Sequence, residues 1–263
     1  MLIKPGTKVS LKDYDPAYTG PYRDADEAKD KLEHQLKELV RLQNLLYADN
    51  RYALLMVLQG VDTAGKDGTI RHVMSGVSPL GVQVTAFKAP THEELAHDFL
   101  WRVHRACPPR GFVGIINRSH YEDVLVARVH ELVPREVWKL RYRQINQFER
   151  MLVENKTIIL KFCLHISKEE QKKRLEERLR DPTHQWKLSL DDLKERRYWS
   201  KYRKAYEAAL SKCSSEWAPW HLVPADHKWY RNLVVAEAIV KTLDDLKLEY
   251  PPPSIDLSHI KLE

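Results

Sequence analysis

The chain has 263 residues, 43% hydrophobic and 30% charged, which is the balance of a globular protein with one large domain or two small ones. A formal net charge of +6 favours an anionic partner, and three widely spaced cysteines indicate neither a disulfide framework nor a zinc site. No apolar run reaches the roughly 18 residues of a membrane span, and the N-terminus lacks the apolar stretch of a signal peptide, so we expect a cytoplasmic protein without a membrane partner.

The first part of the chain predicts an arm, a helix and a buried strand. Residues 1–24 are rich in Pro, Gly, Tyr and Asp, which is typical of an extended arm. Leucines at helical spacing over 25–48 predict an amphipathic helix, so that 1–50 form an N-terminal arm and helix. The continuous apolar run that ends at Gly60 is typical of a buried parallel strand, and 69–77 indicate the helix after it.

The alternation of strands and helices continues to a Pro-rich tail. Three helices begin with a capping-box pattern, in which Ser or Thr is followed three residues later by an acidic residue, at Thr91, Ser167 and Ser189. The remaining predicted strands cover 81–90, 111–123, 156–167 and 220–226, and the range 111–123 includes the loop into which that strand runs. The predicted helices cover 91–107, 133–153, 168–181, 189–210 and 229–247.

This alternation predicts an α/β fold with a five-stranded parallel sheet that is covered by helices on both faces. In such sheets ligands bind beyond the carboxyl ends of the strands. Lys66, Lys88 and Arg118 each follow a predicted strand, so we expect their side chains at one edge of the sheet. No domain boundary is visible, and we expect a single domain over 1–263 in which about 168–210 can close over the site as a lid.

The clearest motif is the loop VLQGVDTAGKDGT at 57–69. Gly60, Gly65 and Lys66 fit the GxxxxGK part of a Walker A phosphate loop, but Asp67 stands where Ser or Thr should follow. Backbone N–H groups in such a turn form an anion site with the N-terminus of the next helix, and the lysine adds a full positive charge. The predicted phosphate-binding residues are Ala64, Gly65, Lys66, Asp67, Gly68 and Thr69.

Two carboxylates in a phosphate loop require an explanation, because they repel bare phosphate. Mg²⁺ is usually held by one or two carboxylates together with substrate phosphates. Since the loop hydroxyl is missing, we expect Asp62 to take its place as a metal ligand. Asp67 fits the first turn of the following helix, where a negative charge is favourable without any metal.

The stretch NRSHYEDVL follows the third predicted strand. Arg118 is placed to reach phosphate from the neighbouring strand end, and Glu122 and Asp123 add carboxylates that can bind metal or act as a base. His120 fits a packed or solvated position better than a ligand position. The alternative for the whole stretch is a polar loop that caps a helix.

Basic residues gather in the predicted lid. Arg174 and Arg178 are one helical turn apart and share a face, and Lys187 follows the break at Asp181-Pro182. Arginines of a lid stabilise charge during phosphoryl transfer. A solvated charged face is the preferred interpretation for the other basic residues of 172–180, whereas Arg178 is kept as a functional candidate.

Three separated motifs, GVDTAGKDGT, FKAPT and NRSHYEDVL, resemble those of the family-2 polyphosphate kinases, and the resemblance extends over roughly 30–250. It implies a three-layer P-loop kinase-like fold with a helical lid, related to nucleoside monophosphate kinases. It also implies reversible transfer of the terminal phosphoryl group of inorganic polyphosphate to a nucleotide, with Mg²⁺ or Mn²⁺. A homo-oligomer, a dimer or a tetramer, is implied by the same resemblance.

The resemblance also suggests roles for single residues. Asp62 matches the loop aspartate that works with the metal, and Arg118 and Arg178 match arginines of the family. Asn117 and Glu122 depart from the commoner DRSWYNRA form of the third motif, and this version resembles the subgroup that phosphorylates both AMP and ADP. The expected nucleotide contacts are Phe87, Lys88, Thr91, Asn117 and Tyr121, although Phe87 fits the core equally well.

We therefore expect direct in-line transfer without a phosphoenzyme, because positioning and charge neutralisation suffice for this reaction. Lys66, Arg118 and Arg178 would neutralise the transferred group. The candidate metal ligands are Asp62, Glu122 and Asp123, and the pattern leaves ligand and base unassigned among them.

Three other functions compete with this interpretation. An ATP-dependent nucleoside monophosphate kinase should carry GK[ST], which Asp67 disfavours. A nucleic-acid-binding protein is allowed by the net charge, but no zinc spacing, RNP motif or helix-turn-helix pattern supports it. A non-catalytic P-loop relative would bind phosphate without turnover.

Overall fold

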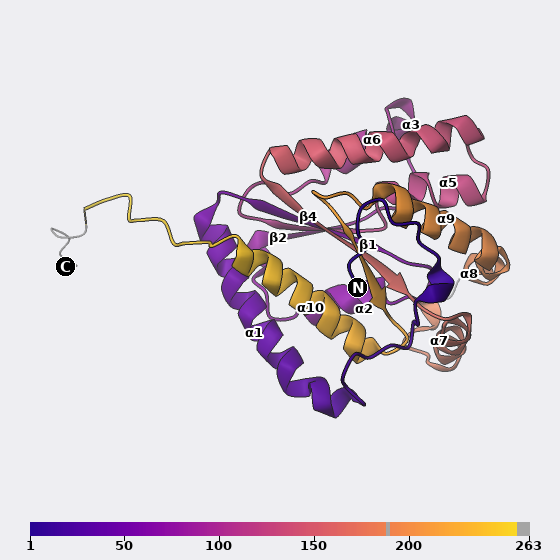
Figure 1. Cartoon of the computed structure of the whole chain (residues 1–263), viewed down its shortest axis with the longest axis horizontal. Coiled ribbons are helices and arrows are strands. Elements are labelled where there is room, and N and C mark those ends of the chain that lie inside the picture. The colour runs from indigo at the N-terminus through magenta and orange to yellow at the C-terminus, as the bar shows by residue number, and fades with distance from the viewer. Residues whose placement is uncertain (188–189, 257–263) are drawn as a thin grey trace.

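Five parallel strands form the central sheet of the computed structural model, which describes residues 1–187 and 190–256 (Figure 1). Their order is β2-β3-β1-β4-β5, with helices on both faces, so the predicted α/β fold with a five-stranded parallel sheet is confirmed. The strands are β1 (Ala53–Gln59), β2 (Val82–Ala86), β3 (Val113–Asn117), β4 (Thr157–His165) and β5 (Trp220–Pro224).

The register of the strands aligns the segments that carry the motifs. Leu58 near the end of β1 lies opposite Asn117, the last residue of β3, and opposite Phe162 of β4. Every residue of β1 is buried, as the continuous apolar run predicts. Because the strands are parallel, the loops that follow β1 and β3 leave the sheet at the same edge.

Two hydrophobic layers hold helices against the sheet. One face is covered by α1 (Ala25–Asp49), α2 (Lys66–Val73) and α10 (Lys228–Asp245), and the other by α6 (Arg135–Glu154) and α9 (Trp199–Cys213) (Figure 1). Leu54, Met56 and Leu58 of β1 face the first layer, while Leu55 and Val57 face the second. This alternation follows from the two-residue period of a strand.

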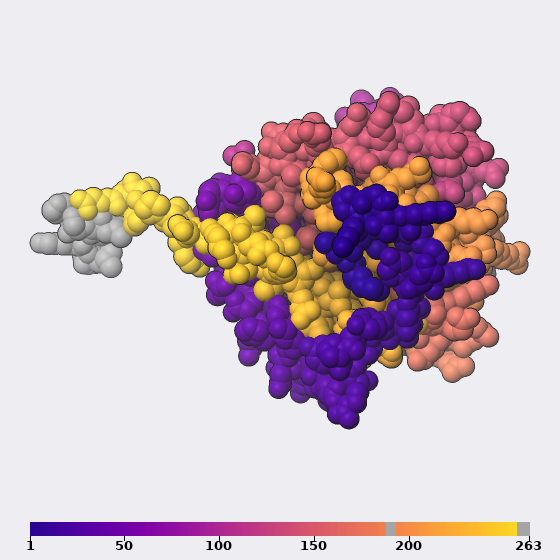
Figure 2. Space-filling view, in the orientation of Figure 1, coloured from indigo at the N-terminus to yellow at the C-terminus, as the bar shows by residue number. Residues whose placement is uncertain are grey.

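The N-terminal arm packs on the sheet edge at β5, and Figure 2 shows it lying against the C-terminal part of the chain. Ile3 N–H donates to Trp220 O and Leu222 N–H donates to Met1 O, each at 2.8 Å, so the arm continues the sheet beyond β5. A short 3₁₀ turn, η1 (Leu11–Asp13), follows. Within 1–187 and 190–256, none of the helices combines the length and apolar surface needed to cross a bilayer.

The prediction of one continuous helix over 91–107 is wrong. Two short helices, α3 (His92–Ala96) and α4 (Trp101–Arg105), occupy this range. They are separated because the Asp98 side chain accepts a hydrogen bond from Leu100 N–H at 2.9 Å, which competes with a continuous helix. The capping box at Thr91 is confirmed in both of its halves.

The lid region begins with α7 (Lys168–Arg180). Its N-cap is confirmed, because Ser167 Oγ accepts from Glu170 N–H at 3.0 Å. The reciprocal half of the predicted box is wrong, since the Glu170 carboxylate pairs with Arg174 and Ser167 N–H donates to Asp226.

The predicted single helix over 189–210 is also wrong. The range instead contains α8 (Leu190–Glu195), a 3₁₀ turn η5 (Arg196–Tyr198) and α9, and a 3₁₀ turn η4 (Gln185–Lys187) precedes them. The expected N-cap Ser189 lies outside the described residues. Two further elements follow β3, namely η3 (His120–Asp123) and α5 (Val126–Val129).

Candidate active site

The loop between β1 and α2 has the backbone shape of a phosphate loop. Gly65 is the N-cap of α2 with φ = +101°, and a Cβ at this position would collide with the Arg231 guanidinium. Gly60 has φ = +155°, and a Cβ there would lie 2.9 Å from Leu164 O. Both positions therefore require glycine. The loop directs the free N–H groups at the start of α2 into one anion site.

Lys66 is folded into this loop rather than extended into solvent. Its Nζ donates to Gly60 O at 2.6 Å and to Val61 O at 3.3 Å, and the residue is buried. Burial lowers the pKa of the Lys66 ammonium, and the charge of Arg118 lowers it further, while Asp62 and Glu122 raise it. A bound phosphate would supply the negative charge that the buried ammonium lacks.

Arg118 follows β3 directly and reaches across to the phosphate loop. Its Nη2 donates to Asp62 Oδ1 at 2.5 Å, so residues 56 positions apart in the chain meet at the sheet edge. The Arg118 backbone has φ = +61°, a conformation that non-glycine residues adopt only when the surroundings enforce it. The predicted convergence of the residues after β1 and β3 is confirmed.

Glu122 joins this group from η3. The Gln59 amide satisfies all its neighbours when its nitrogen donates to Glu122 Oε1 at 3.0 Å and its oxygen accepts from Ser119. Burial raises the pKa of Glu122, although Arg118 and Lys66 counteract this shift. The carboxyl group is therefore held near two cations at the base of a pocket. That pocket is lined by Gly60, Val61, Asp62, Arg118, Glu122, Val126, Gln171, Glu195, Trp199, Tyr202 and Tyr206.

The structure separates Asp123 from the other two candidate metal ligands. Asp123 Oδ1 accepts from Arg141 Nη1 at 3.0 Å, and burial raises its pKa while Arg141 lowers it. Asp123 does not line the pocket that contains Asp62 and Glu122. Of the three candidate carboxylates, Asp62 and Glu122 share one pocket, whereas the turn of η3 directs Asp123 toward Arg141.

The structure places Tyr121, an expected nucleotide contact, in the core rather than at the surface of the site. Its side chain is fully buried, and its hydroxyl donates to Glu149 Oε1 at 2.8 Å. His120 is 1% exposed and contacts the same carboxylate, which confirms its packed position.

The other expected nucleotide contacts lie near the ends of β2 and β3. Phe87 packs against the core beneath the Arg102 guanidinium, which lies 4.9 Å from its ring centre, and Thr91 caps α3. Lys88 is exposed. Asn117 Nδ2 donates to Asp67 Oδ1 at 2.6 Å, so this side chain touches the phosphate loop.

Asp67 lies in the first turn of α2, as expected for a residue that favours the helix dipole. Its carboxylate is 65% exposed and lies 3.9 Å from Lys187 Nζ. Lys187 belongs to the lid region, so the lid approaches the phosphate loop at this point. Gln171 of α7 makes a second approach, because its Nε2 donates to Asp62 O at 3.0 Å.

Sequence reasoning missed two arginines that support the loop from behind. Arg174, expected on a solvated face, is buried and donates to Thr63 O at 3.0 Å and Ala64 O at 3.1 Å, and also to the carbonyls of 225 and 226. Arg231 donates to Ala64 O at 3.4 Å, and burial, together with the charge of Arg174, lowers its pKa to about 10. The candidate Arg178 lies one turn beyond Arg174 and is half-buried.

The donor set fits a metal ion that is bound together with substrate. In the part of the chain that the structure describes, no three His, Cys, Asp or Glu side chains form a metal-binding group. Asp62 and Glu122 both lie near Lys66 and Arg118, while Asp67 also acts on Lys66 and Glu195 also lines the pocket. Magnesium commonly takes one or two carboxylates and completes its shell with phosphate oxygens and water.

Comparison with known proteins gives concordant results. A family model described as Polyphosphate kinase 2 matches residues 22–251. An AMP/ADP-polyphosphate phosphotransferase of Meiothermus ruber is 48% identical and covers 99% of this chain and 98% of its own length. An ADP-polyphosphate phosphotransferase of Rhodopseudomonas palustris is 46% identical over 94% of this chain and 89% of its own. A crystal structure of polyphosphate kinase 2 from Arthrobacter aurescens TC1 superposes with a TM-score of 0.93 at 45% identity, covering 97% of this chain and 92% of that one.

Proposed function

The chain belongs to the polyphosphate kinase 2 family, and we propose that it transfers the terminal phosphoryl group of inorganic polyphosphate to AMP and to ADP. The observation that carries this proposal is the meeting of Lys66 and Arg118 with Asp62 and Glu122 beside a phosphate loop. Two cations match the anionic group in transfer. Two carboxylates would hold a metal ion that neutralises phosphate charge.

The chemistry consists of one displacement. A terminal phosphate oxygen of the acceptor attacks the end phosphorus of polyphosphate, and the shortened polyphosphate leaves from the opposite side. Lys66 and Arg118 are positioned to neutralise the charge on the group in flight, which is the main catalytic task in phosphoryl transfer. Mg²⁺ or Mn²⁺, when bound, supplies further neutralisation, and Asp62 and Glu122 would hold it.

The acceptor side is assigned to the ends of β2 and β3. Asn117 Oδ1 is buried and has no hydrogen-bond partner within 1–187 and 190–256, so it can accept a hydrogen bond from a ligand. Lys88 is exposed and lies close in the chain to Phe87 and Thr91. We propose that Phe87 and Thr91 contact the nucleotide only through their backbone and the exposed atoms of their side chains. Glu122 is proposed to set the acceptor range, because its carboxyl group lies near Lys66 and Arg118.

The lid is assigned to the donor phosphates. Lys187 already faces the phosphate loop through Asp67, and Arg178 lies on the helix that carries Gln171 and Arg174 to this loop. Closure of the lid would bring these cations toward polyphosphate and exclude water. The proposal also places the enzyme in the cytoplasm, with its nucleotide substrates, as a homo-oligomer like its family.

One assay tests the function. Purified protein with Mg²⁺ and long-chain polyphosphate receives AMP or ADP separately, and the products are separated by chromatography. We expect ADP and ATP from AMP, and ATP from ADP, and no product from a Lys66→Met variant. A parallel reaction supplies ATP and AMP without polyphosphate. Turnover in that reaction alone would instead establish an ATP-dependent nucleoside monophosphate kinase.

A further inference from the structure

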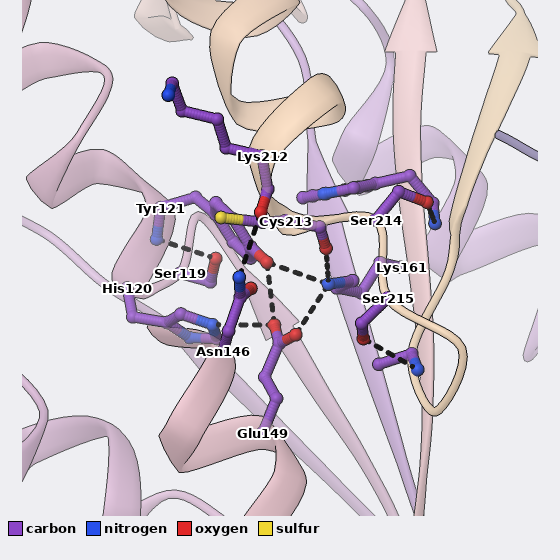
Figure 3. Close-up of polar contacts among 12 residues, drawn as sticks. Ser119, His120, Tyr121, Asn146, Glu149, Lys161, Lys212, Cys213, Ser214 and Ser215 are labelled. Carbon is purple, nitrogen blue, oxygen red and sulfur yellow. Dashed lines mark hydrogen bonds and ion pairs between the residues drawn. The ribbon is translucent and has the colours of Figure 1, made fainter. Parts of the chain in front are cut away.

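A buried polar cluster joins β4, α6, the end of α9 and the turn after β3 (Figure 3). Lys161 of β4 and Glu149 of α6 form an ion pair at 2.6 Å, and both side chains are at most 1% exposed. Lys161 Nζ also donates to Tyr121 Oη at 2.8 Å and to Cys213 O at 2.6 Å. Glu149 Oε1 accepts from Tyr121 Oη at 2.8 Å and lies 3.2 Å from His120 Nε2.

This cluster fills the core at a cost in stability. Burying two charges incurs desolvation, and an apolar pair of the same volume is often as stable or more stable. Burial alone raises the pKa of Glu149, but the charges of Lys161 and His120 outweigh it and the net shift is downward. The charged form of Glu149 is therefore favoured beside Lys161, and the pair makes directional contacts that apolar side chains cannot make.

These contacts end on the segment that carries the proposed catalytic groups. His120 and Tyr121 lie between Arg118 and Glu122 in the chain, and both are fixed to Glu149. The backbone immediately before them is strained, with Arg118 at φ = +61°. Such a conformation persists only where neighbouring contacts over-determine it. The Glu149 carboxylate supplies two of those contacts from outside the segment.

The same cluster reaches the helix that walls the pocket. Lys161 holds the carbonyl of Cys213 at the C-terminal end of α9, and Asn146 Nδ2 of α6 donates to the neighbouring Lys212 O at 2.9 Å. At its other end, α9 contributes Trp199, Tyr202 and Tyr206 to the pocket. Lys161 Nζ therefore connects Tyr121, in the turn after β3, with Cys213, at the end of the helix that lines the pocket.

We propose that Lys161 and Glu149 are positioning residues for phosphoryl transfer, acting through His120 and Tyr121 to hold Arg118 and Glu122 in register with the phosphate loop. This inference rests on the proposed function, since it concerns the rate of that reaction. Displacements of about 1 Å in groups that contact a transition state can lower a rate by up to a hundredfold. The cluster thus controls the rate without touching substrate.

The test uses two sets of variants of the full chain. Tyr121→Phe removes one hydroxyl and keeps the ring, and we expect kcat to fall about fivefold with KM for AMP and for polyphosphate within twofold. Glu149→Gln combined with Lys161→Met removes both charges and keeps both shapes, and we expect a folded protein whose kcat falls about tenfold. Tyr142→Phe is the matched control, because Tyr142 is also buried but its hydroxyl contacts Arg128, and we expect its kcat within twofold of wild type.

Combining Tyr121→Phe with Arg118→Ala distinguishes a positioning role of Tyr121 from a general effect on stability. If Tyr121 acts through Arg118, then Tyr121→Phe should lower kcat less than twofold in an Arg118→Ala background. Full fivefold additivity in that background, or wild-type kcat for Tyr121→Phe, would overturn the inference. If the double variant does not fold, Tyr121→Phe alone decides. Wild-type turnover is measured first, so absence of activity there would count against the proposed function instead.

Discussion

Arg118 Nη2 and Asp62 Oδ1 lie 2.5 Å apart, so the cation assigned to the transferred phosphate is paired with the carboxylate assigned to the metal. Arg118 is 46% exposed and Asp62 22%, and ion pairs in contact with solvent contribute at most about 1 kcal/mol. A phosphate and a metal ion can therefore separate the two side chains at little cost. The pair holds both groups at the pocket until substrate arrives.

The first prediction concerns Asp62. Asp62→Asn keeps the side-chain shape and should keep the fold, because the ion pair that it breaks is weak. Loss of the carboxylate should lower Mg²⁺-dependent kcat/KM about a hundredfold, which is typical for one charged group in a transition-state site. Steady-state assays over a range of Mg²⁺ concentrations check this. Asp245→Asn, at an exposed pair on α10, is the control, and near wild-type activity of Asp62→Asn would remove the metal role.

The second prediction concerns the choice of acceptor by Glu122. Glu122→Asn replaces one of the residues that distinguish this chain from the DRSWYNRA form. We expect kcat/KM for AMP to fall about tenfold more than kcat/KM for ADP. The reason is that AMP carries one phosphate group fewer than ADP, so it has less negative charge to compensate for the lost carboxylate. Parallel assays with both acceptors at fixed polyphosphate measure the ratio. Equal losses with AMP and ADP would exclude Glu122 from acceptor choice.

The third prediction is that metal binding depends on phosphate. Two carboxylates, one of them already paired with Arg118, form an incomplete shell for Mg²⁺. Millimolar Mg²⁺ alone should therefore shift the thermal midpoint by less than about 1 °C, whereas Mg²⁺ with polyphosphate should raise it by several degrees through linkage. Thermal denaturation with each component alone and with both checks this. A large shift with Mg²⁺ alone would indicate a preformed metal site.

The sequence predicts the meeting of the catalytic groups well, because parallel topology determines where strands end. Gly60, Lys66 and Arg118 could be placed at one edge from apolar runs and following loops alone. Neighbouring side chains within a turn could not be assigned in the same way. Tyr121, Glu122 and Asp123 are consecutive, yet one is buried, one faces the pocket and one pairs with Arg141.

Burial of charged residues was the main property that local patterns did not reveal. Arg174 lies in the charged run KKRLEERLR, where its sequence neighbours are those of a solvent-exposed arginine. Its hydrogen-bond partners are the backbone carbonyls of residues 63, 64, 225 and 226, which are distant in the sequence. Lys161 carried a usable signal, since it is a lone charge inside the apolar strand KTIILKFCLHIS. A lysine in that position requires a buried partner.

The fourth prediction concerns acid stability at the edge of the sheet. Burial, and secondarily the N-terminal ammonium, lowers the pKa of His221 to about 4. Above the unfolded-state value of about 6.5 the imidazole is neutral in both states and costs nothing. As the pH falls from 6.5 to 4, the unfolded chain gains a proton that the folded chain refuses, so stability is lost by up to about 3 kcal/mol.

Thermal midpoints measured between pH 7 and pH 4.5 check this for wild type and His221→Gln. The variant should lose less stability over this interval, since glutamine does not titrate. His165, whose pKa burial also lowers, contributes in the same direction and remains in both proteins. Parallel curves for wild type and variant would show that His221 does not control the loss.

The fifth prediction contrasts two arginines one turn apart on α7. Arg174→Ala removes a buried guanidinium that serves four backbone carbonyls, so we expect a loss of about 3 kcal/mol in the free energy of unfolding. For a chain of this size the thermal midpoint should fall by roughly 8 °C. Activity should fall as well, because two of those carbonyls belong to the phosphate loop.

Arg178→Ala should behave in the opposite way. Arg178 is half-buried on the lid helix, and we assign it to the charge of polyphosphate, so kcat should fall about tenfold while the thermal midpoint stays within about 2 °C of wild type. Denaturation and steady-state assays on both variants separate the two roles. A stable but slower Arg178→Ala beside an unstable Arg174→Ala would mean that one helix divides loop support from catalysis between successive turns. Loss of stability without loss of rate for Arg178→Ala would return that residue to a structural role and leave Lys187 as the cation of the lid.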